Sequence, residues 1–67
     1  MSVCVQAVKN LKLEALRNHG AQSFQYKFYV FILSQDNPRR YAQDYFAGLS
    51  DGLDKQTIAK NLGWLIE

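Results

Sequence analysis

One stretch of the chain, SFQYKFYVFILSQ (residues 23–35), constrains the fold more than any other because it is apolar on every side. Its aromatic and β-branched residues alternate as in a strand: Phe24, Tyr26, Phe28, Val30 and Ile32. The opposite side, with Tyr29, Phe31 and Leu33, is apolar too, which is typical of a central, buried helix. A strand needs a partner for its backbone groups, and no second strand pattern is present. The stretch therefore predicts either a buried helix, which we favour, or a strand paired with another copy of the protein.

The chain has 67 residues, which predicts a single domain over residues 1–67. A chain this short buries only about 60% of its unfolded surface and usually needs a disulfide, a metal or a partner. Cys4 and His19 are the only residues of their types, so we expect no internal disulfide, no metal site and no cofactor. Nine aromatic residues exceed what so small a core can hide. We therefore expect a partner surface, and self-association into a homodimer.

The first part of the chain predicts an amphipathic helix that Ser2 caps at its start and Gly20 ends. Its apolar stripe recurs at helical spacing: Cys4, Ala7, Val8, Leu11 and Ala15. Cys4 lies on this stripe and is expected in the core.

Two more helices follow the aromatic stretch. Asn37 is the predicted cap of the first, Pro38 occupies its first position, and Gly52 marks its end. The apolar stripe of that helix is strongly helical: Tyr41, Ala42, Tyr45, Phe46 and Leu49. Asp54 caps the second, which has Ile58, Ala59 and Leu62 facing inward, Gly63 at its stop and Trp64 folded back onto it.

These elements predict a mainly α fold, a compact domain of three or four helices. The alternative is an α+β fold in which one aromatic-rich strand pairs across a dimer and two helices follow it.

The segment GLDKQTIAKNLG (residues 52–63) resembles the first helix and turn of helix-turn-helix domains. In that family the base-reading residues lie on the next helix. Here only WLIE follows, so the resemblance supplies no DNA-reading residue. If the aromatic stretch were a strand, residues 24–67 would also resemble a ribbon-helix-helix. Its aromatic strand face would be unsuited to reading the major groove.

The net charge of +2 is mild, but its distribution is uneven. The first forty residues are mainly basic and the rest mainly acidic. This indicates either two solvated faces or a bipolar surface that orients a partner or stacks protomers head to tail. Arg39 and Arg40 follow the Asn37 cap, where cations oppose the helix dipole. Beside Tyr41 and Tyr45, they predict contact with an acidic protein or with phosphate.

No nucleophile–base pair, phosphate loop or dinucleotide motif is recognisable, so we expect no enzyme. Asp51 and Asp54 flank a helix cap and are expected to bind backbone N–H groups. The sequence has no leader-like segment and no apolar run long enough to span a membrane, and its lone cysteine suits a reducing cytoplasm.

We therefore expect a non-enzymatic, cytoplasmic, protein-binding regulator, an adaptor or an inhibitor that occupies a partner's surface. Phage and mobile-element accessory proteins offer an analogy for small chains of this kind. The alternative is a small nucleic-acid-binding regulator that uses a basic patch, without sequence specificity. The predicted partner-binding residues are Tyr26, Tyr29, Phe31, Arg39, Arg40, Tyr41 and Tyr45.

Overall fold

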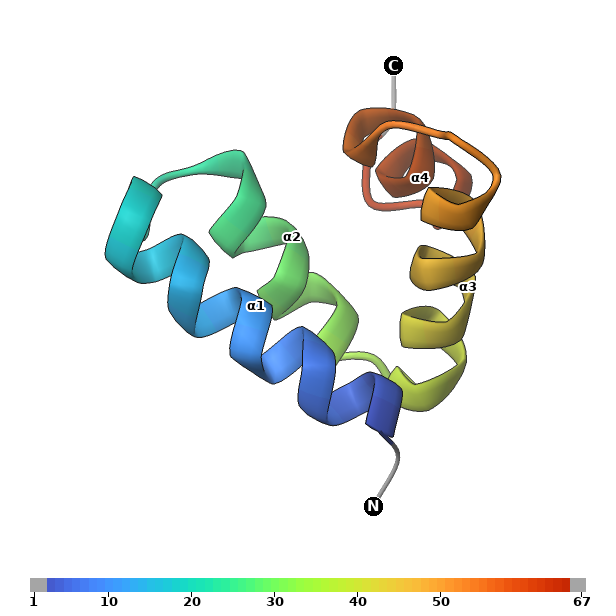
Figure 1. The fold of residues 1–67 in the computed structure, drawn as a ribbon, viewed down its shortest axis with the longest axis horizontal. Coiled ribbons are helices and arrows are strands. Elements are labelled where there is room, and N and C mark those ends of the chain that lie inside the picture. Colours follow the sequence, from blue (N-terminus) through green and yellow to red (C-terminus); the bar gives the residue numbers. More distant parts are fainter. Residues whose placement is uncertain (1–2, 66–67) are drawn as a thin grey trace.

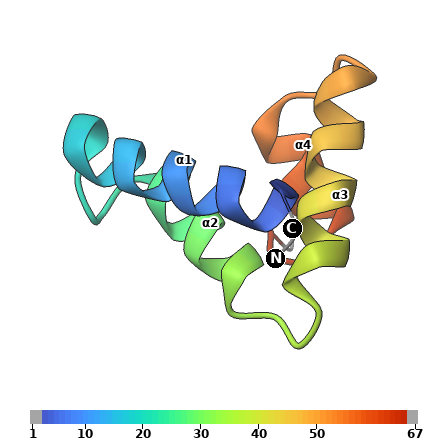
Figure 2. The ribbon, with the colours of Figure 1, turned by 60° about the horizontal axis from the view of Figure 1, so that its bottom comes forward.

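The computed structural model describes residues 3–65, which form four helices: α1 (Val3–His19), α2 (Phe24–Leu33), α3 (Pro38–Ser50) and α4 (Lys55–Asn61). Helices α1 and α2 lie side by side as a hairpin, and α3 crosses the end at which α1 begins and α2 finishes (Figures 1 and 2). The mainly α prediction is confirmed. The strand alternative is wrong, because residues 24–33 are helical and no strand occurs in residues 3–65.

Helix α2 is the buried helix that the aromatic stretch predicts. The Ser23 hydroxyl oxygen accepts a hydrogen bond from the Tyr26 N–H at 3.2 Å, which caps its first turn. Phe28, Tyr29 and Ile32 are buried, and the helix packs against both α1 and α3. A helix satisfies its backbone groups internally, so this apolar segment needs no second chain to pair with.

Helix α1 follows its predicted stripe. Val8 and Ala15 are buried, and Cys4 and Leu11 are half-buried against the core. The helix ends at His19, and the Gly20 N–H donates to the Leu16 carbonyl at 3.1 Å. The predicted Ser2 cap lies outside the described residues.

Side chains cap α3 and α4 as the sequence predicts. The Asn37 side chain accepts from the Arg40 N–H at 3.3 Å, and that of Asp54 accepts from the Thr57 N–H at 2.7 Å. The hydrogen bonds from Thr57 lower the pKa of Asp54, so this cap stays ionised. Both local predictions are therefore confirmed.

The core is an aromatic cluster centred on Phe28, Tyr29 and Tyr45, all at most 2% exposed. The Tyr29 and Tyr45 rings meet edge to face at 5.7 Å, and their hydroxyls share a hydrogen bond at 3.0 Å. The other six aromatic side chains are half-buried: Phe24, Tyr26, Phe31, Tyr41, Phe46 and Trp64. The monomer thus covers much of its aromatic surface by itself, and self-association stays a prediction.

The chain after α4 folds back onto α2. The Trp64 N–H donates to the Ala59 carbonyl at 3.0 Å, and the Gly63 N–H donates to the Lys60 carbonyl at 3.1 Å. These two bonds form a Schellman motif, which Gly63 permits with a φ of +89°. The Trp64 ring then lies 5.0 Å from that of Phe24 and 5.6 Å from that of Phe28.

Helices α3 and α4 cross steeply, since Figure 1 views α4 nearly along its axis while α3 runs across the view. Their contact depends on Gly48, because a Cβ added there would lie 2.8 Å from Cγ1 of the buried Ile58. The segment that resembles the first helix of a helix-turn-helix is thus the second helix of the α3–turn–α4 pair. Its polar outer side chains, Gln56, Thr57 and Asn61, are exposed.

Candidate protein-binding surface

A groove of about 360 Å³ lies where the first turns of α3 meet the end of α4. We call it the α3–α4 groove. Arg40 and Tyr41 come from α3, and Leu62 follows α4, so the steep crossing of the two helices brings them together. The lining residues are Asn37, Arg40, Tyr41, Asp44, Asn61 and Leu62.

Tyr41 is the aromatic residue in the lining of the groove, and its ring begins a series of aromatic contacts. The Tyr41 ring meets that of Phe31 edge to face at 5.9 Å, and the Phe31 ring lies 6.0 Å from that of Trp64. All three side chains are half-buried, so each keeps part of its surface open. Tyr41 therefore brings both apolar ring surface and a phenol to the groove, which suits protein contacts.

Arg40 adds charge to the groove. Its Nε lies 3.8 Å from Oδ2 of Asp44 one turn on, and the two side chains are 74% and 50% exposed. An exposed pair of this kind contributes little to stability. Arg39 is exposed and has no carboxylate within ion-pair distance among residues 3–65. The guanidinium groups are therefore accessible to a partner.

The structure divides the seven predicted partner-binding residues. Arg40 and Tyr41 line the groove, and Arg39 lies beside Arg40 in the first turn of α3. Phe31 packs against the Tyr41 ring but is not part of the lining. Tyr26 lies five residues before Phe31 on α2, so it projects about 140° away around the helix.

Tyr29 and Tyr45 are buried, at 2% and 1% exposure, and they bind each other. Burial raises the pKa of Tyr45, and the hydrogen bond with Tyr29 raises it further, so its phenol stays neutral. The pair therefore holds α2 to α3 and offers no contact surface in the monomer.

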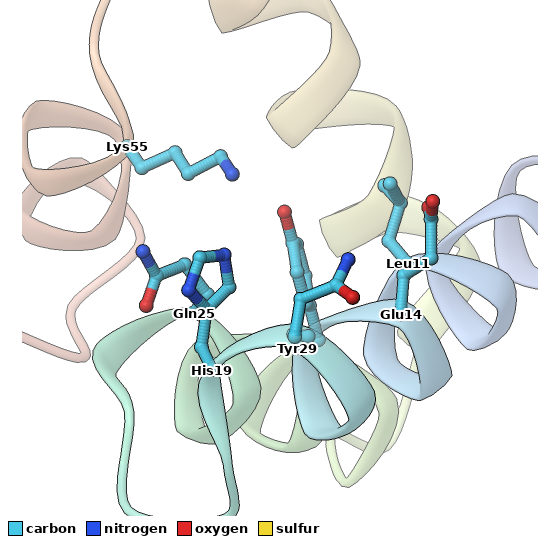
Figure 3. Close-up of a pocket in the computed structure, with 8 residues that line it drawn as sticks. Leu11, Glu14, His19, Gln25, Tyr29 and Lys55 are labelled. Atoms are coloured by element: carbon cyan, nitrogen blue, oxygen red, sulfur yellow. The ribbon is translucent and has the colours of Figure 1, made fainter.

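A smaller hollow of about 160 Å³ lies between α1, α2 and α4. Figure 3 shows Lys55 reaching in from α4 above Tyr29, with His19 and Gln25 on one side and Glu14 and Leu11 on the other. The Lys55 ammonium lies 5.5 Å from the centre of the Tyr29 ring, a cation–π contact.

This hollow holds no recognisable catalytic set. His19 forms no hydrogen bond with a hydroxyl or thiol among residues 3–65. Cys4 lies fifteen residues away along α1, a distance of about 22 Å. In the same range, no three His, Cys, Asp or Glu side chains cluster in a way that could hold a metal.

Sequence reasoning did not find the exposed leucine side chains. Leu13 is 54% exposed, Leu16 42%, and Leu49 and Leu53 38% each. The exposure of Leu13 and Leu16 could have been predicted from the sequence, since they lie off the apolar stripe of α1 among lysines and arginines. Leu49 lies on the stripe of α3 but projects beyond the core.

No protein-family model, curated protein or solved structure matches the chain. Among residues 3–65, none of the helices has the length and apolar character needed to cross a membrane.

Proposed function

We propose that the protein is a non-enzymatic, cytoplasmic protein-binding regulator, an adaptor or inhibitor that acts by occupying a partner's surface. The α3–α4 groove is the observation that carries the proposal. It joins an accessible arginine, Arg40, to the Tyr41 ring, which packs against Phe31, and Arg and Tyr are enriched at the energetic centres of protein interfaces.

The lining of the groove fits an extended segment of the partner. Asn37 and Asn61 lie in the lining. The Asn61 amide can both donate and accept hydrogen bonds, as an extended backbone requires, and the Asn37 amide, whose oxygen caps α3, can donate. Leu62 and Tyr41 offer apolar surface between them.

The charge of the groove favours an acidic segment. Arg39 and Arg40 stand in the first turn of α3, which contains no acidic residue, so both cations oppose the helix dipole. A carboxylate from a partner would offset this unfavourable interaction with the dipole. Asp44 offsets it only weakly, because its Oδ2 lies 3.8 Å from the Arg40 Nε and both side chains are exposed.

The proposal is tested by capture from the native host. A photo-crosslinking amino acid at position 41 should trap a specific protein, and the same group at position 27, on the exposed side of α2, should not. Capture on immobilised protein should be lost with Arg40→Ala plus Tyr41→Ala and kept with Lys27→Ala. Equal capture by every variant would exclude the groove as the binding site.

A second candidate function is nucleic-acid binding through phosphate contacts. The α3–turn–α4 pair favours it, because two helices joined by a short glycine-containing turn at a steep angle form a helix-turn-helix arrangement. The cations available are Arg39, Arg40, Lys9 and Lys12.

Such binding should weaken steeply with salt and be indifferent to sequence. Arg39→Ala plus Arg40→Ala should then lower affinity equally for every duplex, as measured by fluorescence anisotropy. If a selection from random duplexes at physiological salt enriched one defined motif, sequence-specific DNA binding would instead become the favoured function.

A further inference from the structure

The exposed leucines of residues 3–65 fall into two groups of opposite charge. The first, the basic face, lies on the outer side of α1. Leu13 and Leu16 are one turn apart, at 54% and 42% exposure. Lys9 precedes Leu13 by four residues, Lys12 precedes Leu16 by four, and Arg17 follows Leu13 by four, so all five side chains are neighbours on one side of the helix.

The second group, the acidic face, lies at the α3–α4 turn. Leu49 and Leu53, each 38% exposed, stand beside the exposed carboxylates Asp51 and Asp54. Neither carboxylate has an ion-pair partner among residues 3–65. Lys55, the next residue, reaches over the Tyr29 ring, so this face keeps its negative charge.

The two faces lie toward opposite ends of the molecule. Figure 1 shows the second half of α1 at one end of the long axis and the α3–α4 turn at the other. Each face joins two leucines to charges of one sign. Neither face complements itself, because its charges would repel their own copies, whereas each complements the other.

We propose that the basic face of one copy binds the acidic face of the next, so that the protein assembles head to tail. Contacts of this heterologous kind close into a ring or continue as an open filament, whereas a two-fold dimer would place like charges together. The leucines supply the apolar contact, and the charges orient it. The assembly involves neither the α3–α4 groove nor its partner, so the two proposals stand or fall separately.

The contact contains exposed charges, so the assembly weakens as salt screens them. At about 0.15 M ionic strength, interactions between exposed charges fade beyond about 8 Å. The average mass in sedimentation should therefore rise with protein concentration at low salt and fall toward the monomer at high salt.

A charge exchange tests the direction of assembly. In one variant, Lys9→Glu plus Arg17→Glu, both faces are acidic. In the other, Asp51→Lys plus Asp54→Asn, the second face loses its negative charge and gains a positive one, so both faces are basic. Circular dichroism establishes that each variant is folded, and Lys27→Glu plus Arg39→Glu serves as a control with the same charge change as the first variant, away from both faces.

Each folded variant alone should sediment as a monomer under conditions in which the wild-type protein and the control assemble. A 1:1 mixture of the two variants should recover the wild-type mass, because acidic faces then meet basic ones. A wild-type protein that stays monomeric at low salt and high concentration overturns the proposal. So does assembly that survives both charge reversals, or a mixture in which the mass does not recover.

Discussion

The protein has two aromatic clusters built from the same residue types, one buried in the core and one half-buried near the surface. In the core, Phe28, Tyr29 and Tyr45 are almost fully buried, and the two phenols bind each other. Next to the α3–α4 groove, Phe31 and Tyr41 pack against each other and are half-buried, and Tyr41 lines the groove. Residues 28 and 31 are one helical turn apart, so a small rotation around α2 separates a side chain that holds the fold from one that can meet a partner.

The comparison predicts its largest effect at Phe28. Phe28→Ala removes a ring that contacts Phe24, Tyr45 and Trp64, and it should lower the free energy of unfolding by about 3–5 kcal/mol. Tyr41→Ala should cost clearly less, because Tyr41 is already partly in water. Urea denaturation followed by circular dichroism measures both, and equal losses would show that the two clusters do not differ.

The next effect concerns the α3–α4 crossing, which forms the groove. Gly48→Ala places a Cβ against the side chain of Ile58, and such overpacking costs about 1–3 kcal/mol. The better helix propensity of alanine offsets up to about 1 kcal/mol of this.

The matched control uses an Ile58→Ala background, which removes the atoms that the new Cβ meets. There, Gly48→Ala should be neutral or stabilising. A wild-type background that tolerates Gly48→Ala without loss would mean that close approach does not set the crossing.

An effect of similar size is expected at the phenol pair. Tyr45→Phe leaves the Tyr29 hydroxyl buried without its partner, which should cost about 1–3 kcal/mol. Replacing both tyrosines by phenylalanine should cost less than the sum of the two single changes. A double-mutant cycle in urea measures the coupling, and strictly additive losses would contradict it.

The phenol pair also predicts a dependence on pH. In the unfolded chain a tyrosine ionises near pH 10, whereas folded Tyr45 holds its proton to higher pH because its pKa is raised. The contribution of the protonated Tyr45 to the free energy of unfolding is therefore fully present below about pH 10 and is lost as the pH rises above that value. Tyr45→Phe should flatten this alkaline decline in thermal denaturation. If the decline in stability at alkaline pH were unchanged in Tyr45→Phe, groups other than Tyr45 would be its cause.

The smallest effect on stability is expected at the groove. Arg40→Ala removes an exposed ion pair and should change the free energy of unfolding by less than about 1 kcal/mol. If the proposed function holds, the same change should weaken binding to the partner. A variant that loses stability and binding together would mean that the groove, like the core, is part of the folding unit.

The helix ends could be predicted because they depend on neighbours in sequence. The caps at Asn37 and Asp54 and the glycine stops act within one turn, and the structure has them where the sequence predicts them. The pairing of Tyr29 with Tyr45 in the core could not be predicted. Tyr29 belongs to α2, which is apolar all round and so carries no sequence signal for which side faces inward; only contact with α1 and α3 decides it. Tyr45 lies on the apolar stripe of α3, so the sequence indicates an inward position but not the hydrogen bond with Tyr29 that takes up its hydroxyl.

The candidate site was predictable in part for the same reason. Arg40 and Tyr41 are adjacent in sequence, and their position behind the Asn37 cap marks an exposed helix start. Asn61 and Leu62 join them only because α4 crosses α3 steeply, which depends on Gly48 and Ile58 packing together.

The docking of Trp64 onto α2 gives the protein an optical property. Trp64 is the only tryptophan in the chain, and its indole lies among Phe24, Phe28 and Phe31. Indole fluorescence moves to longer wavelengths when water replaces apolar neighbours. The emission of this one side chain therefore reports on a single joint, between the end of α4 and the face of α2. If that joint opened while the helices stayed intact, the emission maximum of Trp64 would shift to longer wavelengths before the helical circular-dichroism signal fell.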